Sequence, residues 1–403
     1  MKPFGTIPPW WDAARMDRAL AASSVATPCF VYDLDIVRDK VATLRAALPP
    51  GVGIHYAVKA NPLPGIIAAL AALVDGLDIA SAGELALVES AAPHAHVSFA
   101  GPGKRDSEIE AAIRAGVTLN LESEGEADRA LAIASRLGIA PKLAVRVNPD
   151  FSLKGSGMKM GGGAAAFGID AERVAPLVRR LIQTGADWRG FHIFAGSQAL
   201  DSEAIAATQA ATVELAGRLA EEAGATPPLV NLGGGFGIPY FANDATVDVT
   251  FVGARLGDAL AARADSLKTS RFAIELGRWL VGECGVYLSR VIDRKESRGE
   301  TFLVTDGGLH HQLAASGNFG TVVRRNYPIA VATRFAEPPS EIVNIVGCLC
   351  TPLDKLGDSV SMPRADVGDV IAVFMAGAYG ASASPAAFLG HGPAPEHIIG
   401  AAD

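Results

Sequence analysis

Residues 54–80 read IHYAVKANPLPGIIAALAALVDGLDIA, and their pattern is the clearest indication of the fold. A helix-like segment joins a short apolar run at 54–59 to a second apolar run at 77–80. The same alternation recurs along the chain, which is typical of parallel strands joined by right-handed helical crossovers. The runs with the composition of buried strands are IHYAVK (54–59), LDIA (77–80), VSFA (97–100), TLNLE (118–122), LAVRV (143–147), FHIFA (191–195), LVNLGG (229–234) and FAIEL (272–276).

The number of these runs predicts a closed (β/α)8 barrel, with an open doubly wound sheet as the alternative. Helix-like segments lie between them, and those at 107–116, 125–138 and 212–224 close on glycine, as helix ends prefer. After about residue 280 the chain keeps strand-like runs but has few helical stretches, which predicts a second, β-rich domain. We expect the barrel over residues 30–280 and the β-rich domain over residues 1–29 and 281–403.

Composition excludes several classes of protein. The net charge of −8 argues against a nucleic-acid surface, which needs clustered Lys and Arg. No run approaches the roughly 18 to 20 apolar residues of a membrane span, and the first residues lack the apolar core of a signal peptide. Four cysteines in 403 residues do not make a disulfide framework. We therefore expect a cytoplasmic protein without nucleic-acid or membrane partners.

Three features fall at predicted strand ends, where barrels of this kind carry their chemistry. Lys59 ends the first strand, GGGFG (233–237) follows the seventh, and ELGR (275–278) ends the eighth. Taken singly, they are an ordinary surface lysine, a turn and a local ion pair. Together they suggest a phosphorylated cofactor that bonds to a lysine and is tuned by an acid. Pyridoxal 5′-phosphate needs a reactive amine, phosphate donors and a carboxylate near its pyridine nitrogen.

Further motifs carry a family resemblance over almost the whole chain. The sequence resembles the fold-type III pyridoxal-phosphate-dependent decarboxylases, which act on diaminopimelate, ornithine and arginine. The segments FHIFAGSQ, KGSGMKMGGG, TDGGLHHQLAASGNFG and RRNYP look more closely like a branch associated with exosortase A and exopolysaccharide gene clusters, where a related enzyme decarboxylates glutamate tethered to an acyl carrier protein. The motifs of the wider family are YAVKAN, DIASAGEL, LNLES, RVNPD, GSQ, NLGGGFGIPY, ELGR, GCLC…D (347–354) and GAYG (377–380).

The resemblance implies a role for each matching residue. Lys59 would bond to the cofactor, Glu275 would keep its pyridine nitrogen protonated, and Cys350 would protonate the substrate carbon across a dimer interface. The active sites would then be shared in a homodimer and completed by the β-rich domain, with Glu84 among the acidic residues near Lys59. Residues implied in cofactor binding are Lys59, Asp78, Arg146, Phe194, Ser197, Gly234, Gly235, Glu275, Arg278 and Tyr379; those implied in substrate binding are Arg278, Arg324, Thr351, Asp354 and Tyr379.

Two departures from the family pattern bear on the substrate. Phe194 stands where the family has a histidine that stacks on the cofactor, and a phenyl ring can stack but cannot donate a hydrogen bond. Thr351 stands where decarboxylases of basic amino acids have Asp or Glu, which pairs with the distal amino group. With Arg324 and Arg325 near the expected substrate segment, we predict decarboxylation of an amino acid whose side chain is neutral, acidic or tethered to a carrier protein.

Alternative functions are a basic amino-acid decarboxylase, an alanine-racemase-like enzyme on the same plan, and a regulatory homologue that binds the cofactor without catalysis. The elements GCLC…D and GAYG argue against the racemase, and the retention of Lys59, Glu275 and Cys350 argues against a dead homologue.

Other polar residues receive simpler interpretations. Cys348 and Cys350 would point to opposite faces of a strand, so no metal is expected on that pair. The histidine pair His310-His311 suggests substrate contacts or no role before it suggests a metal, and His192 is expected to be a satisfied core histidine. The glycine-rich loop 154–168 is a candidate lid.

Overall fold

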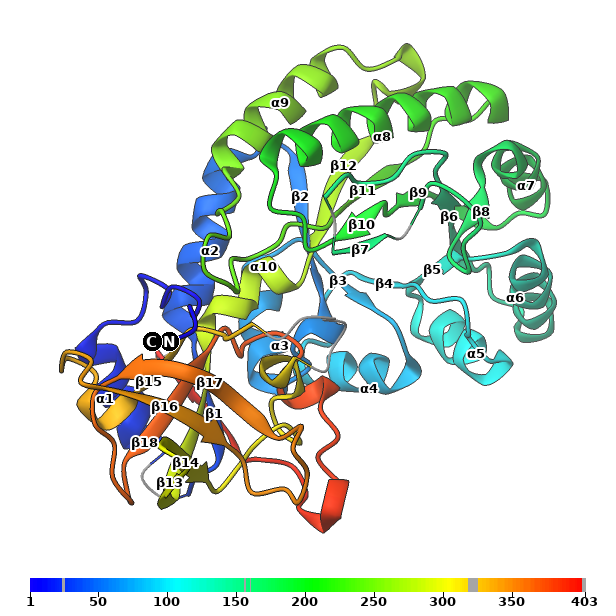
Figure 1. Ribbon diagram of the computed structural model, residues 1–403. Helices are drawn as coiled ribbons and strands as arrows, with labels where there is room; N and C mark the ends of the chain where they lie inside the picture. Colours follow the sequence, from blue (N-terminus) through cyan, green and yellow to red (C-terminus); the bar gives the residue numbers. More distant parts are fainter. Residues whose placement is uncertain (24–25, 156, 160, 318–324, 401–403) are drawn as a thin grey trace. The chain divides into compact units, whose positions relative to one another are not determined.

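The computed structural model describes residues 1–403 except 24–25, 156, 160, 318–324 and 401–403 (Figure 1). The chain forms two compact units. The barrel unit comprises residues 40–237 and 246–277, and the β-rich unit comprises residues 1–39, 238–245 and 278–403. The division near residue 39 falls within helix α2, and strand β1 (Cys29–Asp33) belongs to the β-rich unit because it pairs with strands of that unit.

The barrel unit is built on parallel strands in the order β5-β4-β3-β2-β12-β11-β9-β6-β8, and β5 also pairs with β6. This last pairing closes the ring, so the predicted barrel is confirmed and the open sheet is wrong. Every apolar run predicted as a barrel strand is a strand of the ring. The strands are β2 (Val52–Ala57), β3 (Gly76–Ile79), β4 (Val97–Phe99), β5 (Thr118–Leu121), β6 (Lys142–Asn148), β9 (Asp187–Ile193), β11 (Leu229–Gly234) and β12 (Arg271–Leu276), with β8 (Ile169–Asp170) added beside β6.

Helices surround the strand ring on its outside (Figure 1). The predicted glycine ends are confirmed at Gly116, Gly138 and Gly224, which cap their helices with φ of 67°, 68° and 68°. The helices are α2 (Leu34–Ala47), α3 (Pro64–Ala71), α4 (Ala82–Ala91), α5 (Asp106–Ala115), α6 (Glu124–Leu137), α7 (Ala171–Gln183), α8 (Ser202–Ala223) and α9 (Val249–Ala261), with one-turn helices at Val58–Ala60 and Asp265–Leu267. A two-stranded ribbon joins β7 (Met158–Lys159) to β10 (Gly196–Ser197).

The core of the barrel unit lies between strands and helices. Side chains such as Ile54, Phe99, Leu119 and Ile274 have no exposed surface. Burying each of these side chains contributes about 1.5–3 kcal/mol. The continuous apolar character of the strands follows from burial on both faces of a parallel sheet.

The β-rich unit has an eight-stranded sheet, in which β15-β18-β13-β14-β16-β17 form one path and β1 pairs with β13 and β19. The strand-like runs of the sequence after residue 280, at 285–293, 301–306, 329–336, 341–347 and 369–377, correspond to β13, β14, β15, β16 and β18, whereas β1, β17 and β19 were not predicted. The elements are α1 (Ala13–Ala22), β1 (Cys29–Asp33), α10 (Arg278–Val281), β13 (Gly285–Ser297), β14 (Glu300–Thr305), β15 (Ile329–Val331), β16 (Glu341–Val346), β17 (Lys355–Met362), β18 (Val370–Phe374) and β19 (Glu396–Ile399), with one-turn helices at Gly282–Cys284, Leu313–Ser316, Ala332–Arg334, Ala381–Ala383 and Phe388–Gly390.

Among the described residues, no helix combines the length and apolar character that crossing a membrane requires.

Candidate active site

Lys59 stands at the carboxyl end of the first barrel strand. Strand β2 ends at Ala57, two residues earlier than predicted, and Lys59 lies in the one-turn helix Val58–Ala60. Its neighbours from Ile54 to Asn61 are buried, and Lys59 alone among them is exposed. The Tyr56 hydroxyl donates to the Asn61 carbonyl over 2.8 Å, which fixes the turn on both sides of the lysine. The buried strand therefore presents one free amine at the rim of the barrel.

Glu275 lies next to the last residue of strand β12, and it is held by His192, for which the sequence suggested no such role. His192 Nε2, on β9, lies 2.8 Å from Glu275 Oε2, and both side chains are buried. Burial alone would raise the pKa of Glu275, but the hydrogen bond and charge of His192, with the charges of Lys59 and Arg146, lower this pKa to about 2. The carboxylate is therefore ionised at neutral pH. His192 is a buried core histidine, as the sequence suggested, and its partner is the Glu275 carboxylate.

One cavity of about 300 Å³ brings together Lys59, Asp78, Arg146 and Glu275. All four were predicted site residues, and all four belong to the barrel unit. The remaining lining comes from strand ends, the loops after them and the first turn of α5: Ala57, Ile79, Ala80, Phe99, Ala100, Gly101, Pro102, Gly103, Lys104, Glu108 and Phe167. The four predicted residues thus bring an amine, two carboxylates and a guanidinium to one cavity, whose lining also contains Lys104 and Glu108.

Arg146 is anchored by Glu122, which the motif LNLES contains but for which no role was predicted. Arg146 Nη1 donates to Glu122 Oε1 over 2.7 Å, and its guanidinium lies 5.0 Å from the centre of the Phe167 ring. Glu122 also accepts from the backbone N–H groups of Gly101 and Gly168 over 2.6 and 2.8 Å. Burial raises the pKa of Glu122, but these partners lower it overall, so the Arg146–Glu122 pair stays charged.

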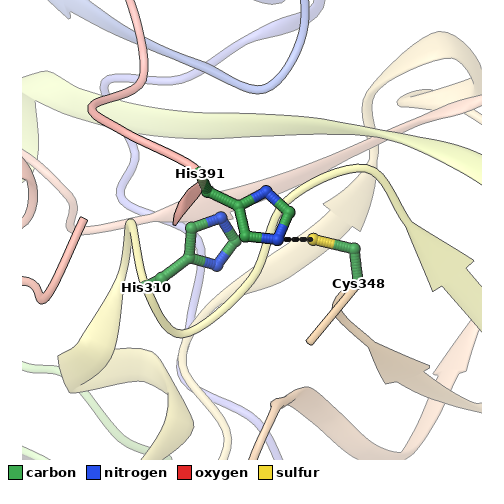
Figure 2. A group of neighbouring side chains, drawn as sticks. All are labelled: His310, Cys348 and His391. Carbon is green, nitrogen blue, oxygen red and sulfur yellow. Dashed lines mark hydrogen bonds between the residues drawn. The ribbon is translucent and has the colours of Figure 1, made fainter. Parts of the chain in front are cut away.

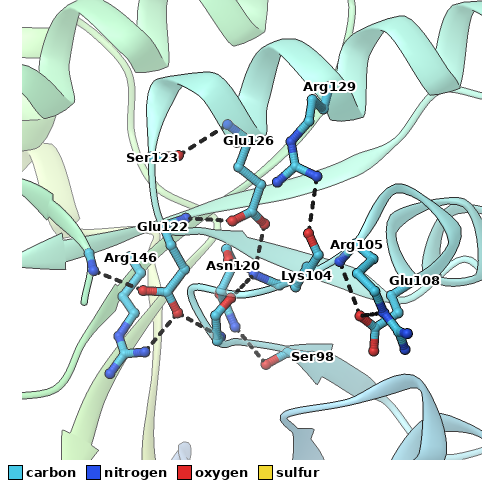
Figure 3. A network of polar contacts seen from close by, with 12 residues as sticks. Ser98, Lys104, Arg105, Glu108, Asn120, Glu122, Ser123, Glu126, Arg129 and Arg146 are labelled. Carbon is cyan, nitrogen blue, oxygen red and sulfur yellow. Dashed lines mark hydrogen bonds and ion pairs between the residues drawn. The ribbon is translucent and has the colours of Figure 1, made fainter. Parts of the chain in front are cut away.

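The polar network continues to Lys104, which lies in the loop between β4 and α5 (Figure 3). Its Nζ donates to the Gly101 carbonyl, the Asn120 carbonyl and Glu126 Oε1 over 2.7, 3.0 and 2.7 Å. The side chain is buried, and every donor of its ammonium group has an acceptor. Lys104 therefore positions the loop 101–104 that lines the cavity. Its place in the loop between β4 and α5, on the side of the barrel that carries the other site residues, was a signal that the sequence analysis did not use.

Asp78 and Glu84 lie on consecutive elements beside Lys59. The Ser98 hydroxyl donates to Asp78 Oδ1, and His55 Nδ1 lies 3.3 Å from Asp78 Oδ2. Glu84 accepts from the Ala80 N–H over 2.6 Å, and burial raises the pKa of Glu84 against the opposing effects of that bond and of Lys59. Asp78 therefore belongs to a buried network with His55 and Ser98, and Glu84 supports the turn after β3.

Phe194 follows β9, and its ring centre lies 5.9 Å from Lys59 Nζ. A flat ring thus stands beside the Lys59 amine. Ser197 lies in β10, which pairs with β7 in the loop 154–168. The same loop supplies Phe167 to the cavity. Its interpretation as a lid stays a prediction, and residues 156 and 160 lie outside the described part of the chain.

The glycines after β11 are required by close backbone packing. A Cβ on Gly234 would lie 2.1 Å from the Glu275 carbonyl oxygen, and one on Gly235, with φ of +77°, would lie 2.1 Å from the Gly196 carbonyl oxygen. Side chains are therefore excluded from this turn, and the backbone itself forms its surface. Such a turn can offer N–H groups to an anion.

Other predicted residues belong to the β-rich unit. Arg278 Nη1 donates to the Tyr240 hydroxyl over 2.6 Å, and its guanidinium lies 4.7 Å from the centre of the Tyr379 ring. Burial lowers the pKa of Arg278, but contacts with Tyr240 and Tyr379 raise this pKa overall. Arg278 therefore remains a cation. Arg278 and Tyr379, predicted to share one ligand, do lie together.

Cys350 and Thr351 follow strand β16. Cys350 is exposed and Thr351 is half-buried. Asp354 is 2% exposed and its carboxylate accepts from the Leu309 and Leu349 N–H groups over 2.7 and 2.8 Å. These bonds give Asp354 a structural role that the resemblance did not suggest. Arg324 lies outside the described residues, whereas Arg325 lies over the Phe241 ring at 3.7 Å.

His310 and His311 differ in their surroundings. His311 Nδ1 lies 3.1 Å from the Tyr287 hydroxyl, and His311 Nε2 lies 3.0 Å from the Gly392 carbonyl oxygen. Burial and the neighbouring rings of His311 and His391 lower the pKa of His310 to about 4, so its imidazole is neutral at pH 7.

The residues of the barrel unit alone provide the groups that pyridoxal phosphate requires. Lys59 offers an exposed amine at a cavity, Glu275 a buried ionised carboxylate in the same cavity, and the turn at Gly234 and Gly235 a surface of bare backbone. These are the groups that the cofactor's aldehyde, pyridine nitrogen and phosphate require.

Comparison with known proteins agrees with this chemistry. Residues 34–282 match the family described as "Pyridoxal-dependent decarboxylase, pyridoxal binding domain". The L-glutamyl-[BtrI acyl-carrier protein] decarboxylase of Niallia circulans is 36% identical over 93% of this chain and 88% of its own. The 2-[(L-alanin-3-ylcarbamoyl)methyl]-2-hydroxybutanedioate decarboxylase of Staphylococcus aureus is 30% identical over 94% and 95%. The crystal structure of diaminopimelate decarboxylase from Helicobacter pylori with L-lysine superposes with a TM-score of 0.81 at 26% identity, over 93% of this chain and 92% of that one.

Proposed function

This chain belongs to the pyridoxal-dependent decarboxylases, and we propose that it removes the α-carboxylate, as CO₂, from an amino acid whose side chain is acidic or tethered to a carrier protein. It is a pyridoxal-phosphate-dependent amino-acid decarboxylase with the two-part fold of its family. The observation that carries the proposal is the cavity in which Lys59 and Glu275 meet.

The substrate class rests on Thr351 and on the relatives. A decarboxylase of a basic amino acid needs an anionic partner for the distal ammonium, because a buried ammonium without one is costly. Thr351 cannot supply that charge. Two relatives act, by their names, on a carrier-bound glutamyl group and on a hydroxybutanedioate, which are tethered and acidic substrates. An acidic or tethered side chain is consistent with both facts.

Bound pyridoxal phosphate supplies an aldehyde that bonds to amines and a ring that withdraws electrons from Cα as the carboxylate leaves. Lys59 would hold the cofactor through its amine. Glu275 Oε2, held by His192, would keep a proton on the pyridine nitrogen because the carboxylate is ionised at neutral pH. Phe194 offers a flat surface against which the ring can pack.

Arg146 places positive charge at the same cavity, and its pairing with Glu122 fixes the guanidinium. We assign the phosphate to the backbone N–H groups of Gly234 and Gly235, with Ser197, Arg278 and Tyr379 as further donors. Asp78 and Arg146 complete the cofactor contacts in this assignment. Arg324, Thr351 and Asp354 remain proposed contributors to substrate binding.

Cys350 is the proposed proton donor to Cα after CO₂ leaves. Its exposure suits a thiol that acts on a second chain, so a homodimer with shared sites is part of the proposal. Mixing inactive Lys59→Ala chains with inactive Cys350→Ala chains should restore activity, because the mixed dimer keeps one complete site. A mixture that stays inactive, although mixed dimers are isolated, would exclude sharing of the two residues.

The direct test is product analysis with the cofactor-loaded enzyme. CO₂ release is measured with free glutamate, glutamate on an acyl carrier protein, diaminopimelate and ornithine. We expect kcat/KM for a free acidic or a carrier-bound substrate to exceed that for diaminopimelate and ornithine by at least about ten-fold, the loss that one unpaired buried charge brings. Faster turnover of either basic substrate would support the alternative, a basic amino-acid decarboxylase.

A second measurement tests the assignment of Lys59. Borohydride reduction followed by peptide mass spectrometry should place the pyridoxyl group on Lys59, and Lys59→Ala should remove both the label and turnover. A label on another lysine would overturn the assignment without bearing on the substrate class.

A further inference from the structure

Three side chains from separate segments of the β-rich unit meet at one point (Figure 2). They are His310 between β14 and the one-turn helix Leu313–Ser316, Cys348 after β16, and His391 after the one-turn helix Phe388–Gly390. The potential ligand atoms of all three lie within 4.8 Å of one another. Cys348 Sγ is 3.9 Å from His391 Nε2, and the rings of His310 and His391 are 4.5 Å apart between centres.

His310 is buried without a hydrogen-bond partner. Its side chain has no exposed surface, and neither Nδ1 nor Nε2 has a partner among the described residues. The neighbouring His311, by contrast, has a partner for each ring nitrogen. A buried polar group without a partner is costly, so a ring whose two nitrogens have no partner among the described residues is a candidate for binding a ligand.

The backbone beside each of the three residues is fixed. Asp354 accepts from Leu309 N–H and Leu349 N–H, the residues next to His310 and Cys348. A Cβ on Gly308 or on Gly347 would lie 2.2 Å from an Asp354 oxygen, which explains why both loops carry glycine there. His311 Nε2 reaches the carbonyl of Gly392, next to His391. A preorganised set of this kind is what a ligand site requires.

We propose that His310, Cys348 and His391 bind one zinc-class divalent ion. Two imidazole nitrogens and a thiolate are the ligands that Zn²⁺ prefers, whereas Ca²⁺ and Mg²⁺ take oxygen ligands. Ligands on a tetrahedral Zn²⁺ lie about 3.5 Å apart for a nitrogen and a sulfur, close to the 3.9 Å between Cys348 and His391. The Cys348 thiol releases its proton to solvent as Sγ binds the ion, and a water molecule fills the fourth position.

The proposal also changes the interpretation of the two cysteines. The sequence indicated no metal on Cys348 and Cys350 as a pair. The partners of Cys348 are instead two histidines that are distant in sequence, which leaves Cys350 free of the ion.

The test uses the full-length, cofactor-loaded enzyme, stripped with a chelator and kept reduced with a phosphine. Co²⁺ alone is titrated in, because a thiolate on cobalt gives an intense near-ultraviolet band and four-coordinate cobalt gives strong visible bands. We expect one Co²⁺ per chain with both signatures, and displacement by one equivalent of Zn²⁺.

Single variants assign the ligands. Cys348→Ser should lose the thiolate band, and His310→Ala and His391→Ala should weaken Co²⁺ binding at least ten-fold. Cys350→Ser is the matched control and should keep the band. His391 is exposed, so its variant tests the site even if His310→Ala fails to fold. Absence of stoichiometric binding, a band that survives Cys348→Ser, or wild-type affinity in His391→Ala would each overturn the proposal.

Discussion

His192 on β9 and Glu275 on β12 meet inside the barrel, with Nε2 and Oε2 2.8 Å apart. Both side chains are buried, and the carboxylate is the group assigned to the pyridine nitrogen. An ionised carboxylate can only accept, so His192 donates from Nε2. His192 therefore sets the position of Glu275 and keeps it charged, as a positioning residue that does not itself contact the reacting atoms.

The first prediction concerns His192. Replacing it with Ala removes a charge-assisted hydrogen bond from a buried carboxylate, so kcat should fall roughly ten- to hundred-fold. The pKa of Glu275 should rise, and the acidic limb of the pH–rate profile should move to higher pH. His192→Gln keeps a donor and should recover part of the loss in both measurements. Equal rates in the two variants with an unmoved acidic limb would refute this positioning role.

The second prediction concerns stability in acid. The pKa of Glu275 is lowered from 4.5 to about 2 in the folded chain. The lowered pKa therefore contributes fully to the free energy of unfolding above pH 4.5. This contribution is lost as the pH falls toward 2. Urea unfolding across this window should show a smaller decline in the free energy of unfolding for Glu275→Gln than for the wild type. Parallel declines would show that the carboxylate does not carry the effect.

The third prediction compares two glycines with positive φ in the barrel unit. Gly235→Ala places a Cβ 2.1 Å from a carbonyl oxygen, whereas Gly51→Ala, at φ of +85°, meets nothing within 4 Å. The Gly51 variant should lose only about 1–2 kcal/mol, the cost of a left-handed alanine. The Gly235 variant should lose clearly more of its free energy of unfolding. It should also bind pyridoxal phosphate more weakly. Equal losses in urea unfolding would mean that the turn relaxes around the added methyl group.

The barrel could be predicted from sequence because each of its strands is a continuous apolar run buried on both faces. Of the three missed strands of the β-rich unit, β17 and β19 lack that signal, whereas β1, with the sequence CFVYD, is a buried apolar run that sequence reasoning could have reached. The sequence of β17, KLGDSVSM, mixes Gly and polar residues, and β19 has only four residues. Strands of this kind form because tertiary partners complete their hydrogen bonds, and a single sequence does not show those partners.

The site residues that could be predicted are those that belong to sequence motifs. Lys59, Asp78, Arg146 and Glu275 were named from strand ends and a resemblance, and they line one cavity. The pairing of His192 with Glu275 could not be predicted because it depends on β9 and β12 both lying beside β11 in the ring. Glu122 is a case that sequence reasoning could have reached, because it follows β5 and its partner Arg146 lies on the adjacent strand β6.

The last prediction concerns Asp354, whose two carboxylate oxygens each accept a backbone N–H. Asp354→Asn keeps one acceptor and turns the other into a donor that faces an N–H group. It should lower the free energy of unfolding by about 2–4 kcal/mol. Asp293→Asn is the exposed control in the same unit and should change it by less than about 0.5 kcal/mol.

Asp354 also links the loops that carry His310 and Cys348, so Asp354→Asn should weaken Co²⁺ binding although it removes no metal ligand. The unfolding free energy of the wild type should then rise with added Zn²⁺, by about 2.7 kcal/mol at a hundred times the dissociation constant. The gain in the variant at the same Zn²⁺ concentration should be smaller, since its affinity is lower. A variant that is destabilised but gains as much from Zn²⁺ as the wild type would separate the two roles, leaving Asp354 as a support for the backbone alone.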